Sequence, residues 1–219
     1  MEVASMDTQV RAALEAVRDS FAEVRGTDEV KRCAEVALRS SAPPAKIVEI
    51  VREGLEIVGE RYEAQTYFLS DLIMAGIMAE QVMALLRPHA SASLETLGRV
   101  VIGTVQGDIH DIGKNLVSTM LIAGGFGIVD IGVDVPVENF VEAWRKNDPK
   151  ILAMSCLLTI AMDEMRRVVQ TFVEVGLRRN VKILIGGRPT TEQFAKEMGA
   201  DGYGANAVDA LKVARDLLI

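Results

Sequence analysis

The second half of the chain alternates five times between a short apolar run and a stretch with helical periodicity. The apolar runs, which predict buried strands, are residues 100–105, 127–131, 151–155, 181–185 and, more weakly, 200–203. The helical stretches that follow them are residues 114–123, 137–146, 162–177, 191–198 and 207–218. Five β–α units at this spacing predict a doubly wound, five-stranded parallel sheet with helices on both faces, spanning residues 97–219.

The first half, residues 1–88, has few glycines and no strand-like run, so it predicts a separate helical domain. Four helical patterns fit it: residues 7–24, a segment from a Thr27 or Asp28 cap to Ser40, residues 43–61 and residues 70–86. Their short connections predict antiparallel neighbours in a four-helix bundle. Residues 89–96, which contain several Ser and Ala, predict an exposed linker between the two domains.

Net charge, cysteine spacing and the length of the apolar runs indicate which partners and which compartment to expect. The net charge is −7 without any basic stretch, which argues against nucleic acid and anionic membrane surfaces. Cys33 and Cys156 lack metal-site spacing, which is typical of a reducing cytoplasm. No N-terminal signal segment is expected, and no run approaching the ~18 apolar residues of a membrane span. The sequence therefore predicts a cytoplasmic protein with no membrane segment.

One polar segment, residues 107–115 (GDIHDIGKN), lies between the first strand run and the first helical stretch. Sheets of this class bind ligands at the carboxyl ends of their strands. The segment holds His110, one of only two histidines, with Asp108 two residues before it. Histidine is the commonest metal ligand, and a carboxylate on its other ring nitrogen fixes the tautomer and raises basicity. The segment predicts an imidazole that is presented to a metal or a proton.

Two other interpretations of this segment are weaker or remain open. In a phosphate-binding P-loop, four residues separate the first glycine from a Gly-Lys pair, which is followed by Ser or Thr. Here five residues separate Gly107 from Gly113, and Asn115 replaces the hydroxyl residue, which argues against a nucleotide phosphate. A purely structural pairing of His110 with Asp108 stays open, because such pairs also occur without function.

Two further features fall at the carboxyl ends of predicted strands. Ser155 ends the third strand run, and Gly186 with Gly187 ends the fourth. Each alone has an ordinary explanation, namely a hydroxyl that satisfies local backbone or a strand-to-helix turn. Paired glycines also allow another group to approach the backbone closely. Because parallel strands end at one edge of the sheet, we expect the histidine segment, the hydroxyl and the glycines to lie together.

Taken together, the patterns Asp108-x-His110-x-x-Gly113, Ser155-x-Leu157 and Gly186-Gly187 resemble the three-part motif of cobalamin-binding modules. Residues 107–115, residues 132–136 (GVDVP) and residues 67–72 (YFLSDL) resemble the corrinoid proteins of methyltransferase systems, which are similar to the cobalamin module of methionine synthase. The resemblance covers nearly the whole chain. It implies a flavodoxin-like or Rossmann-like sheet, and cobalamin or a related corrinoid, including methylcobalamin, as the cofactor.

The resemblance also implies residue roles. His110 would replace the benzimidazole tail as the lower ligand of cobalt, and Asp108 would hydrogen-bond the far imidazole nitrogen. The tail would enter a slot in the sheet, and the residues expected around it are Gly113, Ser155, Leu157, Gly186 and Gly187. Further cofactor-binding candidates are Gly107, Ile109, Asp111, Ile112 and Thr159.

Two implications concern residues outside that motif. The family often extends its proton relay to a hydroxyl at the position that Ala161 occupies here, so a shorter relay or a water is expected. The helical half would cap the upper face of the corrin, with Phe68 and Leu72 shielding the methyl group. Both side chains also suit the bundle core, and that alternative stays open.

The function implied by the resemblance is that of a methyl carrier. A substrate-specific methyltransferase would deliver a methyl group to cobalt(I), and methylcobalt(III) would pass it to a second methyltransferase with a thiol or tetrahydrofolate acceptor. A reductive activator is a third implied partner, and the chain would not be catalytic alone. The alternatives are the cobalamin subunit of a carbon-skeleton mutase, which generally lacks a helical cap, and a cobalamin-sensing regulator, which would carry a DNA-binding head.

Overall fold

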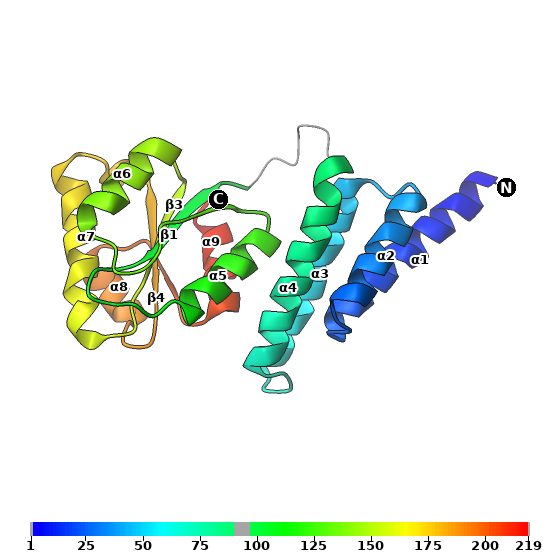
Figure 1. The fold of residues 1–219 in the computed structure, drawn as a ribbon, viewed down its shortest axis with the longest axis horizontal. Helices are drawn as coiled ribbons and strands as arrows, with labels where there is room; N and C mark the ends of the chain where they lie inside the picture. Colours follow the sequence, from blue (N-terminus) through cyan, green and yellow to red (C-terminus); the bar gives the residue numbers. More distant parts are fainter. Residues whose placement is uncertain (1, 90–96, 219) are drawn as a thin grey trace. The chain divides into compact units, whose positions relative to one another are not determined.

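The computed structural model describes residues 2–89 and 97–218, and it divides the chain into two compact units, Met1–Glu95 and Thr96–Ile219 (Figure 1). The first unit is helical and the second is an α/β unit, so the predicted fold class is confirmed. The predicted linker falls mostly on residues 90–96, which lie outside the described residues.

The helical unit contains α1 (Glu2–Ala22), α2 (Thr27–Arg39), α3 (Pro44–Glu63) and α4 (Leu69–Leu86), followed by the short 3₁₀ turn η1 (Arg87–His89). α1 packs against α2 and α3, and α4 packs against the same two helices. Pro44 occupies the first turn of α3, as predicted. The predicted cap of α2 is wrong, because Gly26 is the N-cap residue and Thr27 already lies inside the helix.

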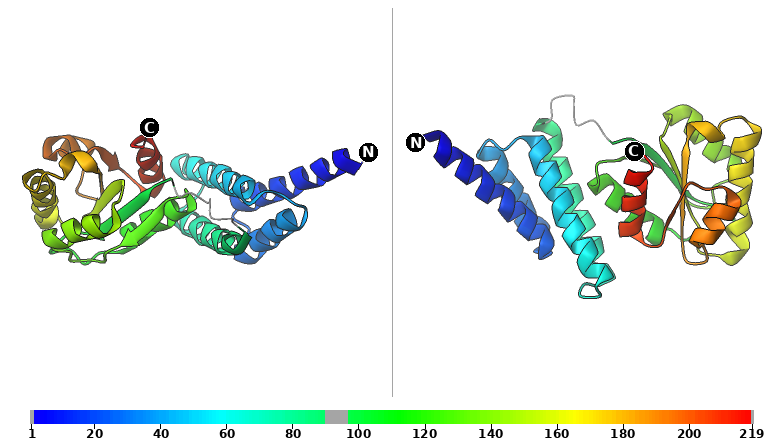
Figure 2. Two further views of the ribbon diagram at one scale, coloured as in Figure 1. Left: turned by 90° about the horizontal axis from the view of Figure 1, so that it is seen from above. Right: turned by 180° about the vertical axis from the view of Figure 1, so that it is seen from behind.

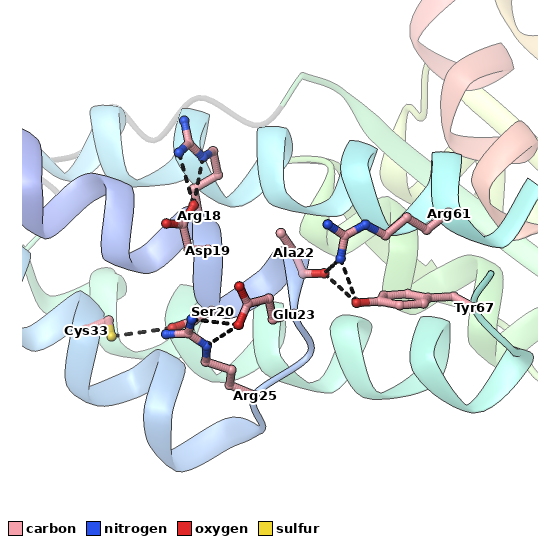
Figure 3. A network of polar contacts seen from close by, with 9 residues as sticks. All are labelled: Arg18, Asp19, Ser20, Ala22, Glu23, Arg25, Cys33, Arg61 and Tyr67. Carbon is pink, nitrogen blue, oxygen red and sulfur yellow. Dashed lines mark hydrogen bonds and ion pairs between the residues drawn. The ribbon is translucent and has the colours of Figure 1, made fainter. Parts of the chain in front are cut away.

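Polar contacts close the carboxyl end of α1 against the rest of the helical unit (Figure 3). The Arg61 guanidinium donates hydrogen bonds to the Ala22 carbonyl and to the Tyr67 hydroxyl, the latter at 2.7 Å. The Tyr67 hydroxyl in turn donates to the same Ala22 carbonyl at 2.7 Å. Terminal carbonyls of a helix need such partners, because they have no donor within the helix.

Helix α4 is the most apolar helix of this unit, although it also carries Ser70, Asp71, Glu80 and Gln81. Among the described residues, it is the helix that meets the length and composition of a membrane span, with a mean hydropathy of 1.5 over 18 residues. The expectation that no run would approach that length is therefore wrong for this segment. One side of α4 is buried in the bundle, as expected of a core helix, through Leu72, Ala75, Gly76, Met78, Ala79, Val82 and Leu86.

The α/β unit contains a fully parallel sheet in the order β2-β1-β3-β4-β5 (Figure 1). Its strands are β1 (Arg99–Thr104), β2 (Gly127–Asp130), β3 (Ile151–Ser155), β4 (Lys182–Gly186) and β5 (Gly202–Gly204). The order is that of flavodoxin-like sheets. Strands β1 and β3 are almost wholly buried, which explains their continuous apolar runs.

The helices of this unit cover both faces of the sheet (Figure 2). They are α5 (Ile112–Ala123), α6 (Val137–Asn147), α7 (Met162–Glu174), α8 (Glu192–Met198) and α9 (Ala207–Asp216), with 3₁₀ turns η2 (Thr159–Ala161) and η3 (Arg178–Asn180). α5 and α9 pack together on one face, and α6, α7 and α8 pack on the other. α7 ends before the predicted Leu177, because Gly176 adopts a left-handed conformation with φ of 74°.

The strand order places a switch point between β1 and β3. The chain leaves β1 toward β2 and later returns to β3 on its other side, so the two connections separate there. Thr104, Ser155 and Gly186 are paired in register at the carboxyl ends of β1, β3 and β4. Ligands of such sheets bind in the crevice at this point. The predicted site residues of the α/β unit lie at this edge of the sheet.

Candidate functional site

The carboxylate of Asp108 is the centre of the site. Asp108 has no solvent exposure, and its two oxygens accept four hydrogen bonds. Oδ1 accepts from the backbone N–H of His110 at 3.1 Å and lies 2.7 Å from the His110 ring Nδ1. Oδ2 accepts from the backbone N–H groups of Leu157 at 2.5 Å and Leu158 at 3.0 Å. One side chain therefore joins the β1–α5 loop to the segment after β3.

These hydrogen bonds keep Asp108 ionised. Burial alone raises the pKa of this carboxyl group, but the Leu157 N–H, the His110 ring, and the N–H groups of His110 and Leu158 together hold its pKa at about 2. An ionised carboxylate only accepts hydrogen bonds, so the proton of the pair lies on His110 Nδ1. Nδ1 of His110 is therefore engaged by Asp108, and Nε2 is the ring nitrogen that this contact leaves available.

His110 is placed to use that lone pair. Its side chain is 49% exposed, and its backbone carbonyl accepts a hydrogen bond from the buried Thr104 hydroxyl at 2.9 Å. In the described parts of the chain, no group of three or more His, Cys, Asp or Glu residues could hold a metal ion. A single imidazole suits a metal that already has its other ligands, as in a tetrapyrrole-like macrocycle, better than a free ion.

Exposed aliphatic side chains surround this imidazole along the chain. Ile109 and Ile112 flank His110 in the β1–α5 loop, and Leu157 and Ile160 lie in the segment after β3, all of them solvent-exposed. Exposed apolar side chains gathered in two neighbouring loops are typical of a ligand or partner surface. The donor set and its apolar surroundings both fit the flat, largely apolar face of a corrin with cobalt at its centre.

The paired glycines are required by the protein's own backbone. A Cβ on Gly187 would lie 1.8 Å from the Cys156 carbonyl oxygen, and Gly187 has φ of 117°. A Cβ on Gly186 would lie 3.0 Å from the Gly204 carbonyl oxygen. The strand-to-helix turn, which was one of the two explanations for the paired glycines, therefore requires a glycine at position 187. By contrast, a Cβ on Gly113 would meet nothing within 4 Å, so open space lies beside the start of α5.

Lys114 and Asn115 form a chain of polar contacts that reaches Asp111, the residue after His110. Lys114 is almost completely buried, and its ammonium donates to Asn115 Oδ1 at 2.8 Å and forms an ion pair with Asp130 at the end of β2. Asn115 Nδ2 then donates to Asp111 Oδ2 at 3.1 Å. Sequence reasoning missed this chain of contacts, although burial of a lysine on an apolar helix face would have signalled a paired role.

Sequence reasoning also missed Cys156 beside Asp108. Burial and the charge of Asp108 raise the pKa of the Cys156 thiol to about 11, so this thiol is protonated. Its Sγ donates to the Leu158 carbonyl at 3.1 Å. Ala161 is buried and Thr159 is exposed in the same 3₁₀ turn. The hydrogen bonds on Asp108 come from the His110 ring and from backbone amides, and the Cys156 thiol is the further side chain that interacts with it.

The structure separates the two candidates in the helical unit. Leu72 is 1% exposed and belongs to the bundle core, which is the alternative that the sequence left open for both residues. Phe68, just before α4, is 73% exposed, and its backbone N–H donates to Asp71 Oδ2 at 2.7 Å. Phe68 therefore has an aromatic surface available to a ligand, whereas Leu72 does not.

Comparisons with known proteins identify families and solved structures that resemble this chain. Residues 98–212 and residues 26–87 match two families that are each described as a B12 binding domain. Trimethylamine corrinoid protein 1 of Methanosarcina acetivorans is 34% identical over 99% of this chain and 100% of its own length.

Two solved structures are also similar over most of the chain. A cobalamin-binding protein from Desulfitobacterium hafniense has a TM-score of 0.83 with 32% identity, covering 93% of this chain and 98% of that one. The methanol:cobalamin methyltransferase complex of Methanosarcina barkeri has a TM-score of 0.81 with 27% identity, covering 94% of this chain and 80% of the matched one. The similarity extends through both the helical and the α/β units.

The lowered pKa of Asp108 predicts a pH-dependent contribution to stability. Asp108→Asn should reduce the free energy of unfolding at pH 7, on the order of 2 kcal/mol, because the folded pKa lies near 2 and the ordinary value is 3.8. This difference should stay constant above about pH 5 and narrow as the pH falls from about 4 toward 2, where the wild-type carboxylate is protonated. Urea unfolding at a series of pH values measures it, with the exposed Asp163→Asn as control. A difference that is unchanged at pH 2.5 contradicts the assignment.

Proposed function

This chain belongs to the B12-binding corrinoid proteins, and we propose that it is the methyl-carrying subunit of a corrinoid-dependent methyltransferase system. It binds cobalamin or a related corrinoid, as its relatives do. The observation that carries the proposal is the contact between His110 Nδ1 and the buried Asp108 carboxylate at 2.7 Å. This contact leaves the other imidazole nitrogen of His110 free, and that nitrogen would hold the cobalt of a bound corrinoid.

The protein's own residues set the basicity of that ligand. Asp108 holds the Nδ1 proton and stays charged, so it stabilises positive charge on the imidazole ring and strengthens the donor atom Nε2. The amides of Leu157 and Leu158 hold Asp108 in place from the opposite side. When bound, the corrinoid supplies a cobalt centre that can take up and release a methyl group. The half-exposed side chain of His110 would hold that centre.

We assign the nucleotide tail to the open space beside Gly113. Ser155 and Gly186, which end neighbouring strands in register, border the same edge of the sheet. Gly187 supports this arrangement indirectly, since it lets the end of β4 approach the backbone of Cys156. Gly107, Ile109, Asp111, Ile112, Leu157 and Thr159 are the remaining residues that we propose to contact the corrinoid.

The chain works with methyltransferases in this proposal. One substrate-specific methyltransferase delivers the methyl group, and a second transfers it to a thiol or to tetrahydrofolate, while a reductive activator restores the active cofactor. The trimethylamine corrinoid protein and the methanol:cobalamin methyltransferase complex support a small methylated amine or alcohol as the class of donor. The match of residues 26–87 to a B12 binding domain favours a methyl carrier over a mutase subunit, which generally lacks this helical part. A cytoplasmic location stays a prediction.

The ligand assignment has a spectroscopic test. With cobalamin bound and reduced to cobalt(II), the full chain should show hyperfine splitting from one axial nitrogen in electron paramagnetic resonance. Labelling histidine with ¹⁵N should change that splitting, because the nitrogen comes from His110. His110→Ala should abolish it, and replacement of the other histidine in His89→Ala should leave it intact. A histidine-derived splitting that persists in His110→Ala would falsify the assignment.

The tail site has a steric test. Gly113→Leu should lower the affinity for cobalamin by at least tenfold, because the new side chain fills the open space into which we place the tail. The fold should tolerate this change, since no protein atom lies within 4 Å of the added Cβ. Cobinamide, which lacks the nucleotide tail, should bind both proteins equally well. Equal losses for cobalamin and cobinamide in an equilibrium titration rule out this placement of the tail.

The role of Phe68 has a photochemical test. We propose that this exposed ring shields the upper face of the bound corrinoid, so Phe68→Ala should speed the photolysis of bound methylcobalamin. Ile73→Ala is the matched control, because Ile73 is also an exposed apolar residue of the same segment and has no proposed contact with the cofactor. Equal photolysis rates in wild type and Phe68→Ala would mean that Phe68 does not shield the cofactor and is an ordinary surface residue.

A further inference from the structure

Asp134, in the connection between β2 and α6, is hydrogen-bonded to the loop that carries His110. Its carboxylate Oδ1 accepts from the backbone N–H of Gly107 at 2.7 Å. Its own backbone N–H donates to the carbonyl of Asp108 at 2.9 Å. Asp134 therefore holds the two residues that immediately precede the Ile109-His110 dipeptide, from a segment 26 residues further along than Asp108.

The backbone at both ends of this contact adopts an uncommon conformation. Asp134 has φ of 52°, in the left-handed region that few residues other than glycine adopt, and Gly107 has φ of 82°. Aspartate and asparagine tolerate that region better than other side chains do. Such a conformation costs free energy and persists where surrounding contacts over-determine it. Here the contacts are the two hydrogen bonds between Asp134 and the His110 loop.

The rest of the same connection is paired with β1. The Val135 N–H donates to the Thr104 carbonyl, and the Thr104 N–H donates to the Gly132 carbonyl, each at 3.0 Å. The Thr104 hydroxyl donates in turn to the His110 carbonyl. The connection is thus fixed to the sheet, and Asp134 projects from a rigid support onto the loop.

We propose that Asp134 is a positioning residue for the cobalt ligand. It fixes the backbone from which the Asp108 carboxylate reaches His110 Nδ1, and thereby decides how fully His110 occupies its liganding position. The inference rests on the proposed role of His110 as the lower ligand. Asp134 is the central residue of the segment 132–136 (GVDVP), which lies beside the His110 loop.

Asp134 is exposed, so its replacement opens no cavity and should leave the fold intact. Three substitutions separate its two contributions. Asp134→Gly removes the acceptor for the Gly107 N–H and relieves the backbone strain. Asp134→Asn keeps an acceptor oxygen and a side chain that tolerates a positive φ. Asp134→Ala removes the acceptor and keeps the strain.

The measurement is the cobalt(II) paramagnetic resonance spectrum of the full chain with bound cobalamin. Asp134→Gly should lower the ratio of nitrogen-ligated to nitrogen-free cobalt about fivefold, the effect of one net hydrogen bond. Asp134→Ala should lower it at least as far, and Asp134→Asn should restore the wild-type ratio. The free energy of unfolding, measured in parallel by urea titration, reports any general loss of stability.

The outcomes are distinct. If Asp134→Gly keeps the wild-type ratio, Asp134 is merely structural and the inference is wrong, whatever happens to stability. If Asp134→Asn fails as completely as Asp134→Gly, an acceptor oxygen is not what matters and the inference also fails. If the wild-type protein itself shows no histidine nitrogen, the proposed function of His110 fails, and the inference falls with it. A lowered ratio in Asp134→Gly alongside a normal wild-type spectrum supports both.

Discussion

The buried negative charge of Asp108 connects the two loops that form the candidate site of the α/β unit. A carboxylate taken out of water loses several kcal/mol of hydration free energy unless hydrogen bonds replace it. Asp108 recovers that loss through four N–H donors, three of them from the backbone, and its pKa consequently falls to about 2 although burial acts in the opposite direction. Because the donors come from the β1–α5 loop and from the segment after β3, the charge fixes both loops at once.

The sheet topology makes this arrangement possible. The order β2-β1-β3 places β1 between the strand that leads to Asp134 and the strand that leads to Leu157. Contacts therefore reach the His110 loop from both neighbours, through Asp134 on one side and the Leu157 amide on the other. An imidazole held in this way keeps one nitrogen for its carboxylate and offers the other to a ligand. Hydrogen bonds of this kind orient the imidazole ring, as the proposed role of His110 requires.

The two glycines at the end of β4 are needed for backbone packing and not only for ligand access. Paired glycines at a strand end suggest space for a ligand, yet the space beside Gly187 belongs to the Cys156 carbonyl. The close approach of β3 and β4 backbones at this edge needs a residue without a side chain. Open space lies instead beside Gly113, where a larger residue would meet no protein atom. In the three-part motif, Gly187 is therefore required by backbone packing, whereas Gly113 borders open space.

The sequence by itself determined the alternation of strands and helices, because side-chain periodicity is local, and the strand and helix ends differ from expectation by only a few residues. It also paired Asp108 with His110, which lie two residues apart. The tertiary structure alone decided which distant groups complete the site. The amides of Leu157 and Leu158 lie 49 and 50 residues beyond Asp108. Backbone amides are common to nearly all residues, so no sequence signal marks the ones that a carboxylate will meet. Likewise, only packing distinguished the exposed Phe68 from the buried Leu72, since both lie in one apolar segment.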